Sequence, residues 1–162
     1  MSKARKVDTP KKNLRMTLIL FLSIVAGIFF FMLVSVLFIQ ARGPLSPDLN
    51  KKRVILIAAI TGISFACLLG ARAVFTKGMA EAKNSLNGLI DKLNLHRNTL
   101  IKYVIVCEMP VMLGIILFVL TGDFIFQVFA AVFIGFMLTV IPLRKKTIEQ
   151  LELSTQEQSL LD

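Results

Sequence analysis

The sequence predicts an all-α integral membrane protein, a bundle of four transmembrane helices. Of its 162 residues, 56% are hydrophobic, more than a soluble domain of this size can cover with polar surface. The apolar residues fall in four separate blocks, and each is close to the ~20 residues that a helix needs to cross a ~30 Å hydrocarbon core. The blocks lack the polar–apolar alternation of barrel strands, so helices are the expected form.

The first transmembrane helix is predicted at residues 16–39, an unbroken uncharged run. It follows a basic tail, residues 1–15, and the combination could be mistaken for a secretory signal sequence. The apolar core of a signal sequence spans about 7–15 residues before a small-residue cleavage site. This block is longer and ends without such a site, so we expect the helix to be retained.

The second helix is predicted at residues 54–75. It carries small residues at strict four-residue spacing, namely Ala58, Gly62, Ala66 and Gly70. A ridge of this kind lets membrane helices approach closely. It therefore predicts a packing surface, either inside the four-helix bundle or between copies of the chain.

A largely polar segment, residues 80–102, separates the second and third helices. Its apolar side chains follow helical spacing, with Arg97 as the charged member of the set: Leu86, Leu89, Ile90, Leu93 and Leu100. This predicts a cytoplasmic amphipathic helical segment, or extensions of the two flanking helices joined near Asn94–Asn98. The segment could lie on the membrane surface or pack against a partner or a second copy.

The third helix is predicted at residues 103–121, with a kink at Pro110. It holds Glu108, the one carboxylate inside an apolar block, and a charge at membrane depth is a functional-site hypothesis by default. Arg72 is expected at a similar depth, so an Arg72–Glu108 ion pair is the leading structural hypothesis and snorkelling of Arg72 its competitor. The functional alternative makes Glu108 a proton or cation site.

The fourth helix is predicted at residues 124–143, and the very short connection before it implies an antiparallel hairpin with the third. Residues 144–162 form the C-terminal tail. Ser154 and Glu157 have the spacing of a capping box that opens a short final helix. Four leucines let the tail dock, and a mobile polar tail is the alternative: Leu151, Leu153, Leu160 and Leu161.

The net charge of +9 is unevenly distributed. Fifteen Lys and Arg lie in the two tails and in the segment between the second and third helices, against four in the first loop. Because cytoplasmic segments carry the excess of positive charge, both termini are predicted to be cytoplasmic, beside anionic lipid headgroups. Nucleic acid is not expected as a partner, since no recognition fold accompanies the charge.

The last two helices and the tail resemble a known family in three motifs: Glu-x-Pro at 108–110, Leu-Thr-Gly at 120–122, and a Pro-x-Lys-like exit after Pro142. These motifs are similar to those of an uncharacterised family of small four-helix inner-membrane proteins of Bacteroidota bacteria. The resemblance covers about the C-terminal third of the chain. It implies a bacterial inner membrane and a four-helix fold, and it implies no activity.

No catalytic motif, metal cluster or nucleotide-binding loop stands out in the sequence, so no cofactor is predicted. Cys67 and Cys107 lie in separate apolar blocks and are expected to be small buried hydrophobic side chains. The predicted function is a non-enzymatic structural or interaction subunit that self-associates or joins a larger membrane assembly. The alternative is a small transporter or ion-translocating subunit that uses Glu108.

Overall fold

The structure, a computed structural model, describes residues 9–85 and 88–161, and this part of the chain forms helices and no strands. The elements are α1 (Pro10–Arg42), the short 3₁₀ helix η1 (Pro47–Lys52), α2 (Arg53–Lys83), α3 (Leu89–Thr121), α4 (Ile125–Thr139), α5 (Arg144–Leu151) and α6 (Thr155–Ser159). The predicted all-α class is confirmed. Helices α1, α2 and α3 run well beyond the apolar blocks that predicted them.

Helices α1 and α3, and α2 together with η1, are long and apolar enough to cross a membrane. A fourth span requires α4 and α5 to act as one, although they meet at a bend of 70°. The predicted fourth helix, residues 124–143, is shorter than expected because α4 ends at Thr139. Pro142 explains the ending, since proline cannot donate a helical hydrogen bond and it disfavours the α conformation of the residue before it.

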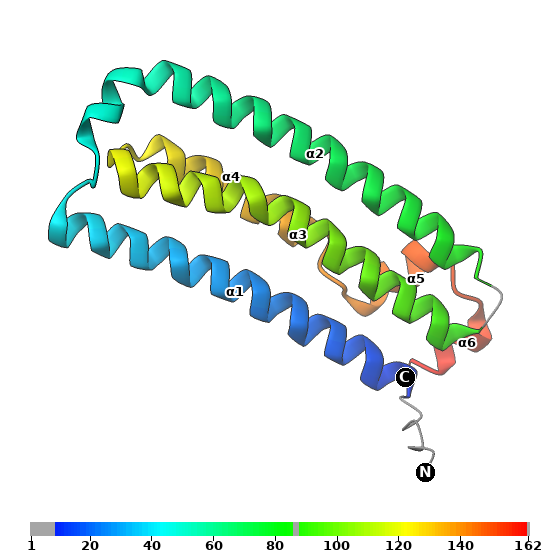
Figure 1. Cartoon of the computed structure of the whole chain (residues 1–162). Coiled ribbons are helices and arrows are strands. Elements are labelled where there is room, and N and C mark those ends of the chain that lie inside the picture. The colour runs from blue at the N-terminus through cyan, green and yellow to red at the C-terminus, as the bar shows by residue number, and fades with distance from the viewer. Residues whose placement is uncertain (1–8, 86–87, 162) are drawn as a thin grey trace, which may run out of the picture.

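Helix α3 is the centre of the molecule (Figure 1). It lies between α1 and α2 with α4 behind it, and it packs against all three. The core residues of α3 meet Phe21, Val25 and Ile28 of α1 on one side and Phe133 and Met137 of α4 on another. The remaining side of α3 carries exposed apolar side chains, among them Ile105, Met109 and Ile116. The fold is therefore one helix flanked on three sides, rather than a closed square of four.

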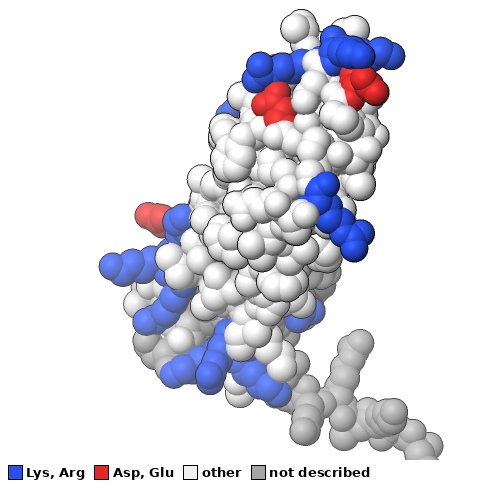
Figure 2. All heavy atoms as spheres, turned by 90° about the vertical axis from the view of Figure 1, so that its left-hand side faces the viewer, with Lys and Arg blue, Asp and Glu red and all other residues white. Residues whose placement is uncertain are grey.

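The molecule has two ends, which we name by what they carry. The tail end holds the start of α1, the adjoining ends of α2 and α3, α5 and α6, and the loop end holds η1 and the α3–α4 turn (Figure 1). Lys and Arg gather toward the two ends, and a largely uncharged surface lies between them (Figure 2). This distribution suits a chain whose middle lies in hydrocarbon.

At the loop end, the connection between α1 and α2 caps the end of α3. Three of its donors reach the last carbonyl groups of that helix: Leu45 N to Val119 O at 3.1 Å, Ser46 N to Leu120 O at 2.8 Å, and Asn50 Nδ2 to Thr121 O at 2.8 Å. These carbonyls have no partner within their own helix. Arg53 at the start of α2 also pairs with Asp123 in the α3–α4 turn at 2.5 Å. The α1–α2 connection thus links the α1–α2 pair to the α3–α4 hairpin.

At the tail end, α2 and α3 extend past their apolar blocks, so that α2 ends at Lys83 and α3 begins at Leu89. This corrects the expected junction near Asn94–Asn98, where α3 is continuous. Gly88, which precedes α3, has a φ of 95°, a backbone conformation that favours glycine. On the predicted apolar face, Leu89, Leu93 and Leu100 are buried, whereas Ile90 and Arg97 are half-buried. Leu86 lies outside the described residues.

The C-terminal tail docks on the adjoining ends of α2 and α3, which decides between the two alternatives for the tail. Leu151, Leu153 and Leu161 are buried in one cluster with Ala82, Leu89 and Leu93, whereas Leu160 is exposed. Two ion pairs border the cluster, Lys83–Glu152 at 2.5 Å and Lys92–Glu157 at 2.8 Å. The capping box is also confirmed: Ser154 Oγ accepts from Glu157 N, and Glu157 Oε2 accepts from Ser154 N.

Candidate functional site

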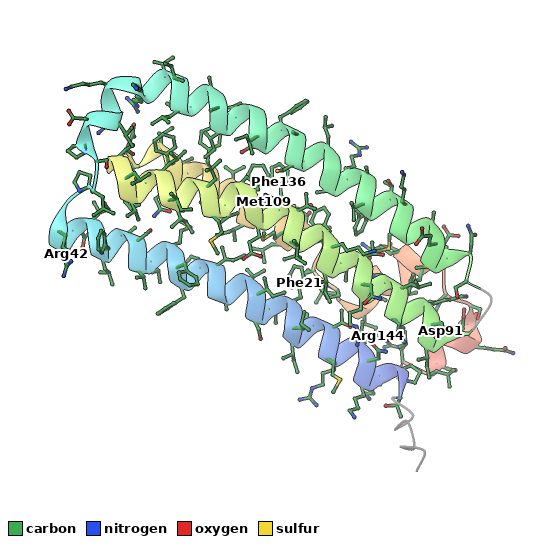
Figure 3. All side chains as sticks on the ribbon, viewed as in Figure 1. Phe21, Arg42, Asp91, Met109, Phe136 and Arg144 are labelled. Atoms are coloured by element: carbon green, nitrogen blue, oxygen red, sulfur yellow. The ribbon has the colours of Figure 1, made fainter. Side chains whose placement is uncertain are left out.

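Two grooves lie on the two flanks of α2. The first, which we call the Glu108 groove, has a volume of about 540 Å³ and is lined by Ile63 of α2 and by Ile105, Glu108, Met109, Met112, Leu113 and Ile116 of α3. The second, the Arg72 groove, has a volume of about 300 Å³ and is lined by Leu68, Arg72 and Phe75 of α2, Tyr103 of α3, and Phe136 and Val140 of α4. Met109 and Phe136, labelled in Figure 3, mark the two grooves. Each groove is apolar apart from one charged side chain and the Tyr103 hydroxyl.

The structure does not bring Arg72 and Glu108 together. Ile63 lines the Glu108 groove, and Arg72 follows it by nine residues, about two and a half helical turns, so the two project from opposite sides of α2. Neither charged side chain makes a hydrogen bond or ion pair with the described part of the chain. The predicted ion pair within one chain is therefore not formed. Counting residues predicts a similar level for the two charges, but it does not fix the rotation of a helix about its axis.

The depths of Arg72 and Glu108 follow from the contact between Gly70 and Val106. A Cβ on Gly70 would lie 3.9 Å from Val106 Cγ1, so these two positions are level. Arg72 lies two residues toward the tail end and Glu108 two residues toward the loop end, about 3 Å each at the rise of an α-helix. The two charges are thus about one helical turn apart along the bundle axis.

The ridge of small residues on α2 faces outward. Ala58, Gly62, Ala66 and Gly70 are all exposed, and a Cβ on Gly62 would meet no atom within 4 Å. Ala58, Gly62 and Ala66 are therefore exposed on the outer side of α2, whereas Gly70 lies within packing distance of Val106 on α3. The second half of the ridge borders the Glu108 groove, because Gly70 follows Ile63 by seven residues, close to two full turns.

Two other glycines permit the close helix contacts within the chain. A Cβ on Gly78 would collide with the side chain of Thr99, and a Cβ on Gly114 would lie 2.7 Å from the carbonyl oxygen of Phe126. Gly78 therefore sets the spacing of α2 and α3, and Gly114 that of α3 and α4. Sequence reasoning did not single out Gly78 because it lies beyond the predicted second span, although it is in four-residue register with Gly70.

Helix α3 continues through the buried Pro110. Proline has no N–H, so the carbonyl of Val106 lacks its usual helical donor. The expected kink at Pro110 stays a prediction.

A polar contact that joins α1 to α4 between the apolar faces was not predicted. Gln127 is buried, and its Nε2 donates to Ser35 Oγ at 2.6 Å and to the Met32 carbonyl at 3.4 Å. Such contacts between helices stabilise membrane proteins by about 0.6–2 kcal/mol. The available signal was the presence of Gln127 in an otherwise apolar block, and its partner on α1 could not be inferred from spacing.

The remaining reactive side chains have structural environments. His96 is buried at the tail end, where its Nε2 lies 2.9 Å from Gln150 Oε1 of α5. Burial lowers the pKa of His96, and the contact with Gln150 opposes this effect. Cys67 is half-buried and Cys107 is buried, both as free thiols. Within residues 9–85 and 88–161, no three His, Cys, Asp or Glu side chains are grouped to hold a metal ion.

The distinctive surface of this molecule is therefore the outer face of α2, with its exposed ridge and an apolar groove on each flank. Each groove holds one charge that has no partner among residues 9–85 and 88–161. Comparisons with protein-family models, with curated proteins and with solved structures found no match to this chain.

Proposed function

We propose that this chain is a non-enzymatic interaction subunit of a membrane assembly, and that it holds a transmembrane helix of a neighbour against α2 beside the Glu108 groove. The observation that carries the proposal is the exposed ridge at Ala58, Gly62, Ala66 and Gly70. Exposed leucine and phenylalanine side chains on a membrane protein are satisfied by lipid. A stripe of small residues gains from the close approach of another helix, where backbone packing replaces loosely packed lipid.

We further propose that the protein lies in a bacterial inner membrane with its tail end in the cytoplasm. The distribution of Lys and Arg supports this orientation, and the Glu-x-Pro and Leu-Thr-Gly motifs support the compartment. The extensions of α2 and α3 then form the cytoplasmic amphipathic segment, whose apolar face is covered by the chain's own tail. The basic residues of this end would lie beside anionic headgroups.

The alternative, an ion-translocating subunit, is favoured by one observation, the unpaired carboxylate of Glu108. A path for protons or cations needs further polar stations across the membrane. The other described side chains that line the Glu108 groove are all apolar. We therefore place helix docking first.

A pair of matched substitutions tests the docking function. Gly62→Ile places a bulky side chain on the ridge, whereas Gly27→Ile places the same side chain on the exposed face of α1; a Cβ at either glycine meets no atom within 4 Å. The measurement is the mass of the complex extracted from native membranes in mild detergent. We expect wild type and Gly27→Ile to run above the monomer mass and Gly62→Ile to fall to it. A monomeric wild type, or an unchanged complex in Gly62→Ile, would overturn the proposal.

A further inference from the structure

We propose that the neighbour is a second copy of this chain. Arg72 of one copy forms an ion pair with Glu108 of the next, between transmembrane helices that lie in the same membrane. The inference rests on the proposed docking function and names its partner. It starts from the two grooves at membrane depth. One presents the negative charge of Glu108 and the other the positive charge of Arg72, and neither charge has a partner in the described part of the chain. An isolated charge in hydrocarbon is costly, and an opposite charge on a neighbouring helix offsets that cost.

The depths of the two charges permit the pair. Copies inserted in the same orientation share one depth scale, so Arg72 of one copy lies about 6 Å closer to the tail end than Glu108 of the next, four residues in total at the helical rise. The long arginine side chain can span such an offset. Its planar guanidinium can also donate two parallel hydrogen bonds to one carboxylate, which favours arginine for desolvated pairs.

The shapes of the two flanks also fit. Phe65 precedes Arg72 by seven residues, about two turns, and therefore projects from the same side of α2. Phe65 is 62% exposed and Leu69, one turn before Arg72 along the helix, is 54% exposed. Large apolar side chains thus surround Arg72, while the Glu108 groove is apolar and is bordered by the small residues Ala66 and Gly70. The large side chains beside Arg72 of one copy can therefore fill the Glu108 groove of the next copy.

In one arrangement the contact is heterologous and joins the two different flanks of α2. Each copy offers Arg72 to one neighbour and Glu108 to another, so the contact repeats from copy to copy. Such contacts close into a ring when the rotation between copies permits it, and otherwise they extend as a row. In the other arrangement, a twofold axis through the facing ridges forms both pairs in one dimer, because Arg72 of each copy then lies opposite Glu108 of its mate.

Charge reversal followed by mixing tests the pair. Glu108→Arg and Arg72→Glu are prepared separately, labelled with two fluorophores and reconstituted in vesicles of one lipid composition, with association measured by energy transfer. Each variant alone places like charges at every contact, so we expect its association to weaken about tenfold or more. In the mixture, every contact between unlike variants again joins opposite charges, and association should return close to that of wild type.

Substitutions with uncharged side chains provide a second test if a reversed charge prevents the variant from inserting into the membrane. Glu108→Gln and Arg72→Gln should each weaken association, and the double variant should lose little more than either single one. Thiol crosslinking tests the contact directly: with Cys67 and Cys107 replaced by alanine, a bifunctional thiol reagent long enough to span the offset should join copies with Arg72→Cys to copies with Glu108→Cys, and it should join neither population to itself.

The outcomes separate this inference from the proposed function. If wild type associates but mixing does not restore association, or the neutral losses add, the ion pair between copies is wrong and helix docking survives. If purified wild type stays monomeric while the complex from native membranes depends on Gly62, the neighbour is a different protein and the inference also fails. If neither preparation associates, both proposals are overturned.

Discussion

Gly78 of α2 lies so close to Thr99 of α3 that a Cβ on the glycine would overlap the threonine side chain. Thr99 is buried, and its Oγ1 donates to the Leu95 carbonyl at 2.9 Å, which restricts its freedom to move aside. The tail-end halves of the two helices are therefore spaced by the absence of a side chain at residue 78.

Replacing Gly78 should separate α2 from α3. Gly78→Ala is expected to destabilise the fold by about 1–3 kcal/mol, the usual cost of overpacking. The measurement is the midpoint of thermal unfolding in detergent micelles. Gly62→Ala is the control, because its added methyl group meets no atom within 4 Å. Equal melting of the two variants would contradict the assigned spacing role.

Docking of the tail should depend on Leu151, which is 1% exposed. Leu151→Ala removes most of a buried side chain and should cost about 2–5 kcal/mol, which is enough to release a short tail. Limited trypsin digestion would then cleave after Arg144–Lys146 much faster than in wild type. Leu160→Ala is the control, since Leu160 is 59% exposed and its loss should leave the digestion rate unchanged.

Acid should weaken the docked tail through Glu157. The hydrogen bond from Lys92 and the backbone N–H of Ser154 lower the pKa of Glu157 from its ordinary value of 4.5. A lowered pKa in the docked state means that the stabilisation is present above pH 4.5 and is lost as the pH falls below it. Amide hydrogen exchange of α6, corrected for its chemical pH dependence, should accelerate in this range. Glu157→Gln should exchange faster at neutral pH and lose most of the acid response.

A second acid response is expected nearer to neutral pH from His96. Burial lowers the pKa of His96 below 6.5, so the unfolded chain binds its proton more readily than the folded chain does. The stabilisation from neutral His96 is therefore complete above pH 6.5 and is lost as the pH falls toward the lower folded value. Exchange of α5 amides, corrected for its chemical pH dependence, should rise as the pH falls below 6.5, and His96→Asn should remove that rise while Gln150 stays in place.

The contact between Ser35 and Gln127 should hold α1 to α4. Ser35→Ala leaves Gln127 Nε2 with only the long contact to the Met32 carbonyl, and a loss of about 0.6–2 kcal/mol is expected. Ser35→Ala together with Gln127→Leu should cost less than the sum of the single changes, since the two residues act as one contact. Unfolding in detergent measures all three variants, and Ser23→Ala, an exposed serine of α1, is the control. Strictly additive losses would show that the contact contributes nothing.

The hydrophobic blocks predicted the helices well, because the thickness of a bilayer fixes how long an apolar run must be. The helix ends were less predictable: α1 begins at Pro10 and α3 at Leu89, where polar residues join helices that packing stabilises. The position of Glu108 along α3 followed from counting residues. Its distance from Arg72 did not, since neighbouring helices can rotate freely about their axes until side chains interlock, and a sequence does not state that rotation.

The central position of α3 has a consequence for synthesis. Helices α1 and α2 leave the ribosome first, yet each finds its main packing partner in α3, which follows later. Helices α1 and α2 must therefore remain in the bilayer as a loosely packed pair until α3 inserts between them. Leu151, Leu153 and Leu161, which follow α4 in the chain, then pack against Ala82, Leu89 and Leu93. A chain truncated before residue 144 would keep α1 to α4 and still lack the leucines that cover the adjoining ends of α2 and α3.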